Sequence, residues 1–353
     1  MSAPIPAVVL GGSGYVAGEL LRLIAAHPRF ELTAVMSDSR PGEPVARAFP
    51  HLASAYGATC FSSQAVIEKH ITQLPATAVF SAAPHGAAAA LIDSLLTKAA
   101  AAGTRARVVD MSADFRYRSV QAFESNYAQT HAAPARIGEF TCALPEHLAA
   151  LATEHVAHPG CFATATLLAA VPLIALKLAS ARLFVAGVTG STGSGRKCVE
   201  GTHHPLRHSD LYAYNALAHR HVPEMQQCVR AACGQDVDIA FVPHSGPFAR
   251  GIHVTVQAEL PRAHDSAQVL AALRSFYAHA PFVRVLDKPP RMKDVVASNY
   301  AHLSAVSNGR SVAVLCVIDN LVKGAAGGAL QWMNRLFKLP ETAGLTAPAP
   351  GWT

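Results

Sequence analysis

The first forty residues constrain the fold of this chain more than any other stretch. The apolar run IPAVVL (5–10) is typical of a buried strand, and the glycine-rich turn GGSGYVAG (11–18) follows it directly. Apolar residues then recur at helical spacing in ELLRLIAAHP (19–28), and FELTAVM (30–36) has the composition of a second strand. A strand, turn, helix and strand of this length predict the opening of a parallel, doubly wound (Rossmann) sheet.

Two further segments extend this sheet. ATAVFSAA (76–83) and ARVVDMS (106–112) are strand candidates, and the alanine-rich stretch 86–103 between them predicts a helix that ends at Gly103. We therefore expect residues 1–158 to form a dinucleotide-binding domain of the α/β class. The stretch 323–339 predicts a helix that ends the ordered chain.

The pattern changes after Pro159. A helix follows Cys161, and then come longer segments that alternate between apolar and polar residues: 237–244, 251–260 and 310–319. Such alternation is typical of an antiparallel sheet with one covered face. Residues 159–319 are therefore expected to form an α+β domain with a largely antiparallel sheet. The proline-rich tail after residue 339 is expected to be loose.

Charge and cysteine usage exclude several classes of protein. The net charge is +6, but the 29 Lys and Arg residues are scattered and only two Trp are present, so we expect no nucleic-acid partner. No apolar run is long enough to span a bilayer and the first residues lack an export signal, so we expect a cytoplasmic protein without a membrane partner. Seven cysteines without a C-x-x-C pair predict free thiols rather than a disulfide framework.

The glycine-rich turn predicts a dinucleotide site. Glycine permits a tight turn and a close approach to a pyrophosphate, and a small residue at 17 lets the helix pack on the strand. The residues predicted to contact the cofactor here are Gly11, Gly12, Ser13, Gly14, Tyr15, Val16 and Ala17. At the end of the second strand, Ser37, Ser39 and Arg40 favour NADP, whereas the acidic Asp38 favours NAD. We predict NADP.

HPGCFATAT (158–166) sets Cys161 between a Pro-Gly turn and a helix. Such a cysteine can be an inert buried thiol, a metal ligand or a nucleophile, and a helix N-terminus lowers the pKa of a thiol. Five histidines lie in 203–221, but Pro205 interrupts any helix there and no H-E-x-x-H is present, so we expect no metal site. A histidine of this stretch better suits the acid/base that a cysteine mechanism needs. The loop GVTGSTGSGRK (187–197) fits either an anion site or a flexible surface loop.

Taken together and in order, the motifs resemble those of the N-acetyl-γ-glutamyl-phosphate reductase family, within the group that includes aspartate-semialdehyde dehydrogenase and glyceraldehyde-phosphate dehydrogenase. The stretches that carry the resemblance are GGSGYVAGELLRLIAAHP, FSAAPHG, VVDMSADFR, HPGCFATAT, GVTGSTGSGRK, HRHVPEM, RGIHVTV and DNLVKGAAGGALQ. Two stretches, 243–251 and 201–215, depart from the family's usual pattern, and both are expected near the substrate.

The resemblance implies specific roles. Cys161 is the nucleophile, and His219, or else His221, is the acid/base. If H-R-H were extended, the two rings would point to opposite faces, so we expect only one to reach the site. The resemblance adds Pro84, Gly86, Asn320 and Gly324 to the cofactor site, and assigns Arg116, Arg196, His244 and Arg250 to the substrate.

The resemblance implies the reduction of an acyl phosphate, a small anionic substrate, to an aldehyde by NADPH through a cysteine thioester, in a homodimer or homotetramer. It also implies that 159–319 is the catalytic and oligomerisation domain and that 320–353 returns to the dinucleotide-binding domain of 1–158. The resemblance implies N-acetyl-γ-glutamyl phosphate and arginine biosynthesis. A reductase of a carrier-linked aminoadipyl phosphate in lysine biosynthesis and an aspartate-semialdehyde dehydrogenase are alternatives. A non-enzymatic dinucleotide-binding redox sensor is a further alternative, and it predicts no unusually reactive thiol.

Overall fold

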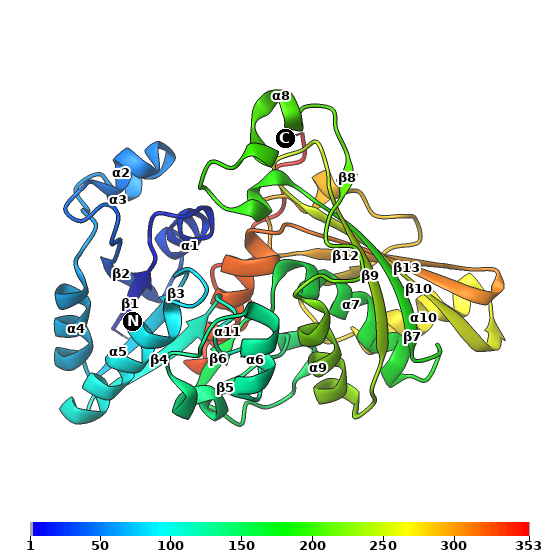
Figure 1. Ribbon diagram of the computed structural model, residues 1–353, viewed down its shortest axis with the longest axis horizontal. Helices are drawn as coiled ribbons and strands as arrows, with labels where there is room; N and C mark the ends of the chain where they lie inside the picture. Colours follow the sequence, from blue (N-terminus) through cyan, green and yellow to red (C-terminus); the bar gives the residue numbers. More distant parts are fainter. Residues whose placement is uncertain (1–2, 353) are drawn as a thin grey trace. The chain divides into compact units, whose positions relative to one another are not determined.

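The computed structural model describes residues 3–352, and the chain forms two compact units (Figure 1). Unit 1 contains residues 3–142, Ala150–His158 and Ala326–Thr346. Unit 2 contains Ala143–Ala149, Pro159–Ala325 and residues 347–352. Each unit is built on one sheet.

Unit 1 has a six-stranded sheet in the order β2-β1-β3-β4-β6-β5, and every neighbouring pair is parallel. Its strands are β1 Ile5–Leu10, β2 Phe30–Val35, β3 Ala76–Ser81, β4 Arg105–Asp110, β5 Phe140–Thr141 and β6 His155–Ala157. Its helices are α1 Tyr15–Ala25, α2 Val45–Ala48, α3 Ala53–Tyr56, α4 Gln64–Gln73, α5 Ala88–Ala102, α6 Val120–Tyr127 and α11 Gly327–Leu336, with 3₁₀ turns η1 Pro50–Leu52 and η2 Pro134–Glu139. The predicted parallel, doubly wound sheet is confirmed.

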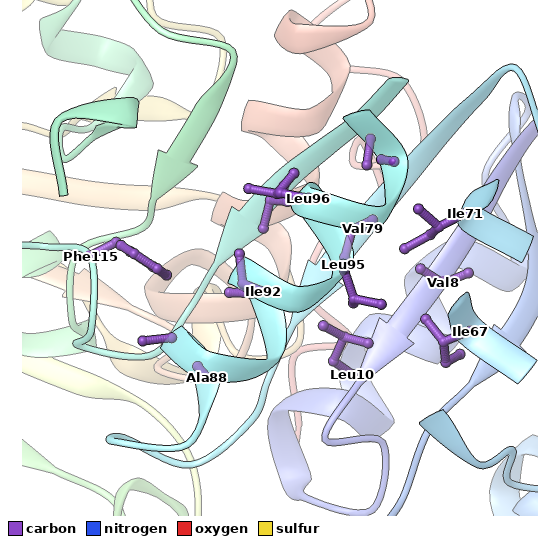
Figure 2. Packing of buried hydrophobic residues seen from close by; sticks show 14 of the residues in the cluster. Val8, Leu10, Ile67, Ile71, Val79, Ala88, Ile92, Leu95, Leu96 and Phe115 are labelled. Carbon is purple, nitrogen blue, oxygen red and sulfur yellow. The ribbon is translucent and has the colours of Figure 1, made fainter. Parts of the chain in front are cut away.

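The hydrophobic core of unit 1 joins its sheet to helices α4 and α5. Side chains alternate across a strand, so Val8 and Leu10 of β1 face the same side. There they pack with Ile92 and Leu95 of α5 and with Ile67 of α4 (Figure 2). The C-terminal end of α5 is set by Gly103, whose φ of +67° closes the helix, as the sequence predicts.

Unit 2 has a seven-stranded mixed sheet in the order β11-β12-β13-β10-β7-β9-β8. The strands are β7 Arg182–Thr189, β8 Tyr212–Ala213, β9 Asp238–Ser245, β10 Ile252–His264, β11 Val283–Val285, β12 Ala301–Ser307 and β13 Gly309–Ile318. The helices are α7 Cys161–Ala175, α8 His204–Arg207, α9 Val222–Cys233 and α10 Ser266–Phe276, with 3₁₀ turns η3 Pro145–His147, η4 Ser191–Ser194, η5 Glu200–Thr202 and η6 Met292–Asp294 and a π-helical turn η7 Val322–Ala326. Four of its six strand pairs are antiparallel, which confirms the largely antiparallel sheet.

Helix α7 is the centre of unit 2. Every residue from Phe162 to Ile174 is buried, because α7 packs against α9 as well as against strands β10 and β13. A helix that is apolar all round must be covered on all sides, and α7 meets that condition. Its first residue is Cys161, so the core helix of this unit fixes the position of the cysteine.

The C-terminal tail differs from expectation. Leu345 is 2% exposed, and the Asn334 amide of α11 donates to the backbone oxygens of Glu341 (3.2 Å) and Ala343 (2.9 Å). The loose tail predicted from the proline content is therefore wrong for residues 340–346, which pack on α11. A buried asparagine supplied donors that composition alone does not reveal.

Candidate active site

The glycine turn of unit 1 has the close approaches that a dinucleotide site needs. Gly11 has a φ of +69°, and a Cβ there would lie 2.6 Å from the backbone of Ala82. A Cβ on Gly12 would meet Val35 and would lie 2.9 Å from the Met36 oxygen. Gly14, the N-cap of α1, has nothing within 4 Å of an added Cβ. Glycine is thus required on the sheet side of the turn, while the side at the start of α1 is open, and this arrangement fits a pyrophosphate.

The other predicted residues of this region surround the same turn. Ala17 is fully buried against the sheet, whereas Tyr15 is 38% exposed and Val16 is half-buried. The hydroxyls of Ser13, Ser37 and Ser39 form a cluster with Oγ–Oγ distances of 3.2, 3.3 and 3.4 Å.

Arg40 follows Ser39 in the chain, and its guanidinium is 3.4 Å from Glu43. Asp38 is exposed. The segment after β2 therefore carries short hydroxyl side chains followed by a cation.

Pro84 and Gly86 lie in the turn between β3 and α5. Gly86 has a φ of +82°, and its N–H donates to Asp114 Oδ1 at 2.8 Å. The other carboxylate oxygen of Asp114 accepts from Ala89 N–H at 2.9 Å, so a buried aspartate binds the start of α5.

Arg116, which is predicted to bind the substrate, lies in unit 1. Its side chain is 4% exposed. Nε donates to the backbone oxygen of His158 at 2.9 Å and Nη2 donates to that of Met111 at 2.8 Å. In unit 1 the guanidinium thus holds the backbone directly before the Pro-Gly-Cys turn.

In unit 2, Cys161 lines a cavity of about 410 Å³. The residues that line it are Cys161, Phe162, Thr189, Gly193, Ser194, Tyr212, Tyr214, Asn215, His219, Arg220, His221 and Ser245. Cys161 is partly exposed, and the first intrahelical hydrogen bond of α7 runs from Thr164 N–H to Gly160 O at 2.7 Å. The N–H groups of residues 161–163 therefore precede that bond and lie at the positive end of the helix.

Both predicted histidines reach this cavity. The expectation that only one does is wrong, because residues 219–221 form a turn into α9 rather than an extended segment. The two rings meet edge to face with centroids 4.7 Å apart, and each residue is 7% exposed. Burial, with a smaller effect of the Arg220 charge, lowers the pKa of His219 to about 4.

Three residues predicted to bind substrate do not line this cavity. Arg196 is exposed in the loop after η4. His244 alternates with Ser245 on β9 and so lies on the opposite face of the strand. Arg250 binds Asp319 through Nε at 3.0 Å and Nη2 at 2.9 Å.

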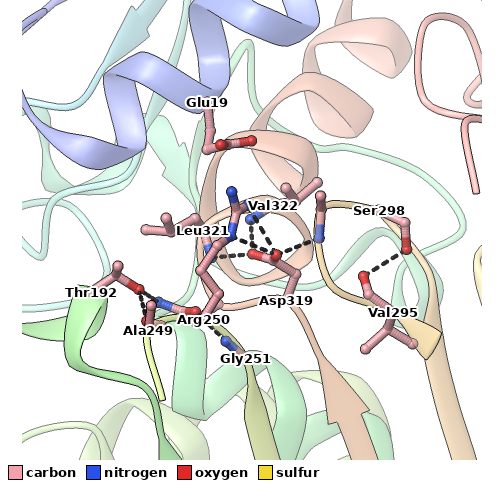
Figure 3. A network of polar contacts seen from close by, with 12 residues as sticks. Glu19, Thr192, Ala249, Arg250, Gly251, Val295, Ser298, Asp319, Leu321 and Val322 are labelled. Carbon is pink, nitrogen blue, oxygen red and sulfur yellow. Dashed lines mark hydrogen bonds and ion pairs between the residues drawn. The ribbon is translucent and has the colours of Figure 1, made fainter. Parts of the chain in front are cut away.

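The Arg250–Asp319 pair belongs to a network that holds the turn after β13 (Figure 3). Buried Asp319 also accepts from the N–H groups of Leu321 (2.8 Å), Val322 (2.9 Å) and Ala297 (2.6 Å). Asn320 accepts from Gly251 N–H at 2.8 Å and donates to Thr192 Oγ1 at 3.0 Å.

The turn that this network holds is in contact with Cys161. A Cβ on Gly324 would lie only 2.7 Å from the Cβ of Cys161. Asn320 and Gly324 thus lie in unit 2, in a turn fixed by Asp319, and Gly324 packs on Cys161.

Two residues of the site were not predicted from the sequence. Arg220, between the two histidines, is the one residue with a permanent positive charge among the described residues that line the cavity. Glu224 of α9 is fully buried, and its Oε1 accepts from Gly160 N–H at 2.6 Å. Both lie inside the motif HRHVPEM. Glu224 could have been predicted, because a carboxylate in the first turn of a helix is a common partner of backbone N–H groups.

Among residues 3–352, no group of three or more His, Cys, Asp and Glu side chains is arranged to hold a metal ion. In the same range, no helix combines the length and the apolar character needed to cross a membrane.

Comparison with known proteins places the chain in a class. Residues 6–158 match the NAD-binding domain of semialdehyde dehydrogenases, and residues 161–320 match the dimerisation domain of semialdehyde dehydrogenases. The chain therefore belongs to the semialdehyde dehydrogenase family of oxidoreductases, with a nicotinamide dinucleotide as cofactor.

Relatives that it matches over nearly their full length include N-acetyl-gamma-glutamyl-phosphate reductases. That of Ectopseudomonas mendocina (strain ymp) is 40% identical, covering 97% of this chain and 98% of its own. That of Nitrosococcus oceani is 38% identical, with the same coverage. The resemblance drawn from the motifs is confirmed.

Solved structures agree on the fold. Aspartate semialdehyde dehydrogenase II from Vibrio cholerae, complexed with ASA, superposes with a TM-score of 0.68 at 16% identity, covering 96% of this chain and 99% of its own. A probable aspartate-semialdehyde dehydrogenase from Pseudomonas aeruginosa gives 0.66 at 17% identity, covering 95% and 98%. At these identities the likeness concerns the fold alone.

Proposed function

We propose that this chain reduces N-acetyl-γ-glutamyl phosphate to N-acetylglutamate semialdehyde and inorganic phosphate with NADPH. The observation that carries this proposal is the cavity in which Cys161, the first residue of the buried helix α7, lies with His219 and His221. The substrate is the one named for relatives that match 97% of the chain.

Cys161 supplies the nucleophile. Its sulfur attacks the acyl carbon, the bond from that carbon to the phosphate oxygen breaks, and the phosphate leaves with the electron pair. A thioester on Cys161 remains. The nicotinamide, when bound, supplies the hydride that reduces this thioester. The backbone N–H groups at the start of α7 stabilise negative charge on the carbonyl oxygen, and a cavity histidine assists the collapse that releases the aldehyde and the thiolate.

Arg220 is proposed to bind an anionic group of the substrate, since it carries the permanent positive charge of the cavity lining. The roles of Arg116, Arg196, His244 and Arg250 at the substrate stay predictions. The bonds of Arg116 to two backbone oxygens and of Arg250 to Asp319 favour a role in holding the chain around the site.

NADP is proposed over NAD. The clustered hydroxyls of Ser13, Ser37 and Ser39 beside Arg40 supply neutral donors and a cation, which suit a 2′-phosphate better than a free ribose hydroxyl. The exposed Asp38 can turn away from a phosphate bound there.

The chain is proposed to form a homodimer or homotetramer through the outer face of the unit 2 sheet. Paired residues place Val306, Ala313, Gln257 and Phe184 in one row across β12, β13, β10 and β7. Val306 is 48% exposed and Phe184 is 49% exposed. A second copy would cover the exposed Val306 and Phe184 of this row, and the match to a dimerisation domain supports the assembly.

The predicted roles of the two domains are part of the same proposal. Residues 1–158 with 320–353 serve dinucleotide binding and 159–319 serve catalysis and assembly. The predicted cytoplasmic location suits an enzyme that uses a small metabolite and a nicotinamide cofactor.

The test is phosphate-dependent reduction of NADP with N-acetylglutamate semialdehyde, followed by the absorbance of NADPH. Cys161→Ser should lower kcat by about 10³-fold or more, because it removes the nucleophile. NADPH binding, followed by its fluorescence, should stay unchanged. Cys60→Ser, which alters an exposed thiol outside the site, is the matched control and should keep full activity. Unchanged turnover by Cys161→Ser would exclude the thioester mechanism.

A further inference from the structure

A buried ion pair holds the turn after β13 inside unit 2. Lys323 is the one buried lysine among residues 3–352, and it is 0% exposed. Its ammonium donates to Glu146 Oε1 at 2.5 Å, and the side chain of this glutamate is 0% exposed as well. The ammonium nitrogen lies over the ring of Phe282, 5.7 Å from its centroid. Both charges are therefore removed from water and bound to each other.

Glu146 has a fixed position relative to α7. It lies in the 3₁₀ turn η3 of unit 2, and the next residue, His147, bonds through Nε2 to the Tyr277 hydroxyl at 2.9 Å. That hydroxyl donates its proton to the backbone oxygen of Leu168 at 2.7 Å. Leu168 belongs to α7, the helix that begins at the cysteine of the cavity. Two successive hydrogen bonds thus connect the turn that carries the glutamate to the helix that carries the nucleophile.

Lys323 directly precedes the glycine that contacts the cysteine. Both residues belong to the π-helical turn η7, in which Gly324 N–H donates to Asp319 O, five residues earlier, at 3.0 Å. Turns of this kind are rare and are frequent at functional sites. A Cβ on Gly324 would lie 2.7 Å from the Cβ of Cys161. Adjacent residues of one turn therefore contact Glu146 on one side and the nucleophile on the other.

Stability alone does not account for a buried ion pair. Taking two charges out of water often costs more than their attraction returns, so an apolar pair of the same volume is often as stable or more stable. An ion pair adds a defined geometry, because a hydrogen bond between an ammonium and one carboxylate oxygen forms only within a narrow range of distances. Such a bond suits a turn whose glycine has to stay in contact with the cysteine.

We propose that Lys323 and Glu146 are positioning residues for the reaction: their ion pair holds η7 at a set distance from α7, and Gly324 thereby holds the sulfur of Cys161 in its reactive position. Neither charged residue is among the described residues that line the cavity, so both act through the turn. The kinetic test of this inference rests on the proposed function, whereas the position of the sulfur is also measurable without turnover.

Two variants of Glu146 separate the distance from the charge. Glu146→Gln keeps the length of the side chain and an acceptor oxygen for Lys323, whereas Glu146→Asp keeps the charge and shortens the side chain. We expect Glu146→Gln to keep kcat within about threefold of the wild type, and Glu146→Asp to lose about tenfold or more with an almost unchanged KM for the aldehyde. A role in charge neutralisation alone predicts the reverse order. That order, or equal kcat values for the two variants, would overturn the proposal.

A double variant removes the bond without leaving a buried charge. Glu146→Leu combined with Lys323→Met replaces the ion pair by apolar side chains of similar size, so the fold should be kept. We expect kcat to fall about tenfold or more, because η7 loses its bond to η3. A folded double variant with the wild-type kcat would contradict the inference, even if the single variants do not fold.

Glu68 and Lys98 form the matched control pair. Their nitrogen–oxygen distance is also 2.5 Å, but the pair joins α4 to α5 in unit 1 and is partly exposed. Glu68→Gln, Glu68→Asp and the double variant of Glu68→Leu with Lys98→Met should all match the wild type in kcat.

Alkylation by iodoacetamide at pH 7 reports on the sulfur without turnover. Mass spectrometry of the peptide that contains Cys161 gives the rate, with the exposed Cys60 as the internal reference. We expect this rate to change about threefold or more in Glu146→Asp and in the double variant, and to stay within about twofold in Glu146→Gln. Wild-type rates in all three would overturn the proposal. Failure of the proposed function is distinguishable, because it would leave the wild type without phosphate-dependent activity while the alkylation rates still test the position of the sulfur.

Discussion

At the scale of single residues, the approach that bears most directly on the nucleophile is between Gly324 and Cys161. An added Cβ at 324 would lie 2.7 Å from the cysteine Cβ and 3.1 Å from its Cα. Space, rather than an unusual backbone angle, therefore requires glycine here. The turn that Asp319 holds contacts Cys161 on one side. This contact restricts the positions that the sulfur can take.

Gly324→Ala should displace Cys161 or the turn by a few tenths of an ångström or more, since the neighbouring atoms belong to the backbone and to a short side chain. Small displacements of a reacting group are costly, so we expect kcat to fall about tenfold or more, with NADPH affinity less affected. Gly138→Ala, where an added Cβ meets nothing within 4 Å, is the control. A wild-type kcat for Gly324→Ala would show that this contact does not set the sulfur position.

At the scale of secondary structure, the first turn of α9 organises both reacting groups. The N-cap His221 presents its N–H to His219, and three residues later Glu224 presents its carboxylate to Gly160, the N-cap of α7. The two helices pack together, so α9 holds the histidine and the cysteine turn at once. Residues of the motif HRHVPEM therefore make hydrogen bonds at the N-terminal ends of both α7 and α9.

Glu224→Ala should leave the buried N–H of Gly160 without its acceptor, which costs about 1–3 kcal/mol of stability. We expect kcat to fall with little change in KM, because the cysteine turn loosens while the cavity keeps its other walls. Glu224→Gln keeps an acceptor oxygen and should recover most of the activity, and Glu200→Ala, an exposed glutamate, is the control. If the Ala and Gln variants behave alike in kcat and in thermal midpoint, the hydrogen bond to Gly160 has no positioning role.

At the scale of the whole molecule, buried titratable groups set the response to acid. Burial, the largest effect in each case, lowers the pKa of His147, His155 and His219 to about 4. Burial also raises the pKa of Asp110 to about 6, despite its bonds from Ser112. Between pH 6.5 and 4 the unfolded chain binds more protons than the folded chain at the histidines and fewer at the aspartate.

As the pH drops, the three histidines reduce the free energy of unfolding and the aspartate increases it. The histidines outnumber the aspartate, so stability should fall as the pH drops from 6.5 towards 4. Each histidine contributes about 2 kcal/mol of loss at pH 5, from a linkage of 1.36 kcal/mol per pKa unit. Thermal unfolding followed by circular dichroism at pH 7.5 and 5.0 should show a lower midpoint at pH 5.0. His51→Gln, an exposed position, should leave this difference unchanged. An equal or higher midpoint at pH 5.0 would mean that these histidines are accessible to protons in the folded state.

Several elements were predictable because their signals are local. The strand, glycine turn and helix of residues 5–25, the helix that Gly103 ends and the long alternating strands all follow from side-chain periodicity. Strand β12, AHLSAVS, was missed, because Ser304 is buried in it and blurs the alternation. Two-residue and three-residue strands such as β5 and β6 carry too few side chains for a period to be visible.

By itself, the sequence determined the class of fold, the dinucleotide turn, the cysteine at a helix start and the family, since each rests on residue types at fixed spacing along the chain. Only the tertiary structure decided that both His219 and His221 face one cavity, that Glu224 binds Gly160, and that Arg250 pairs with Asp319. These contacts join residues that are distant in the sequence, or depend on a turn in place of an extended segment. Their geometry follows from how helices and sheet pack, and periodicity along one element does not contain that information.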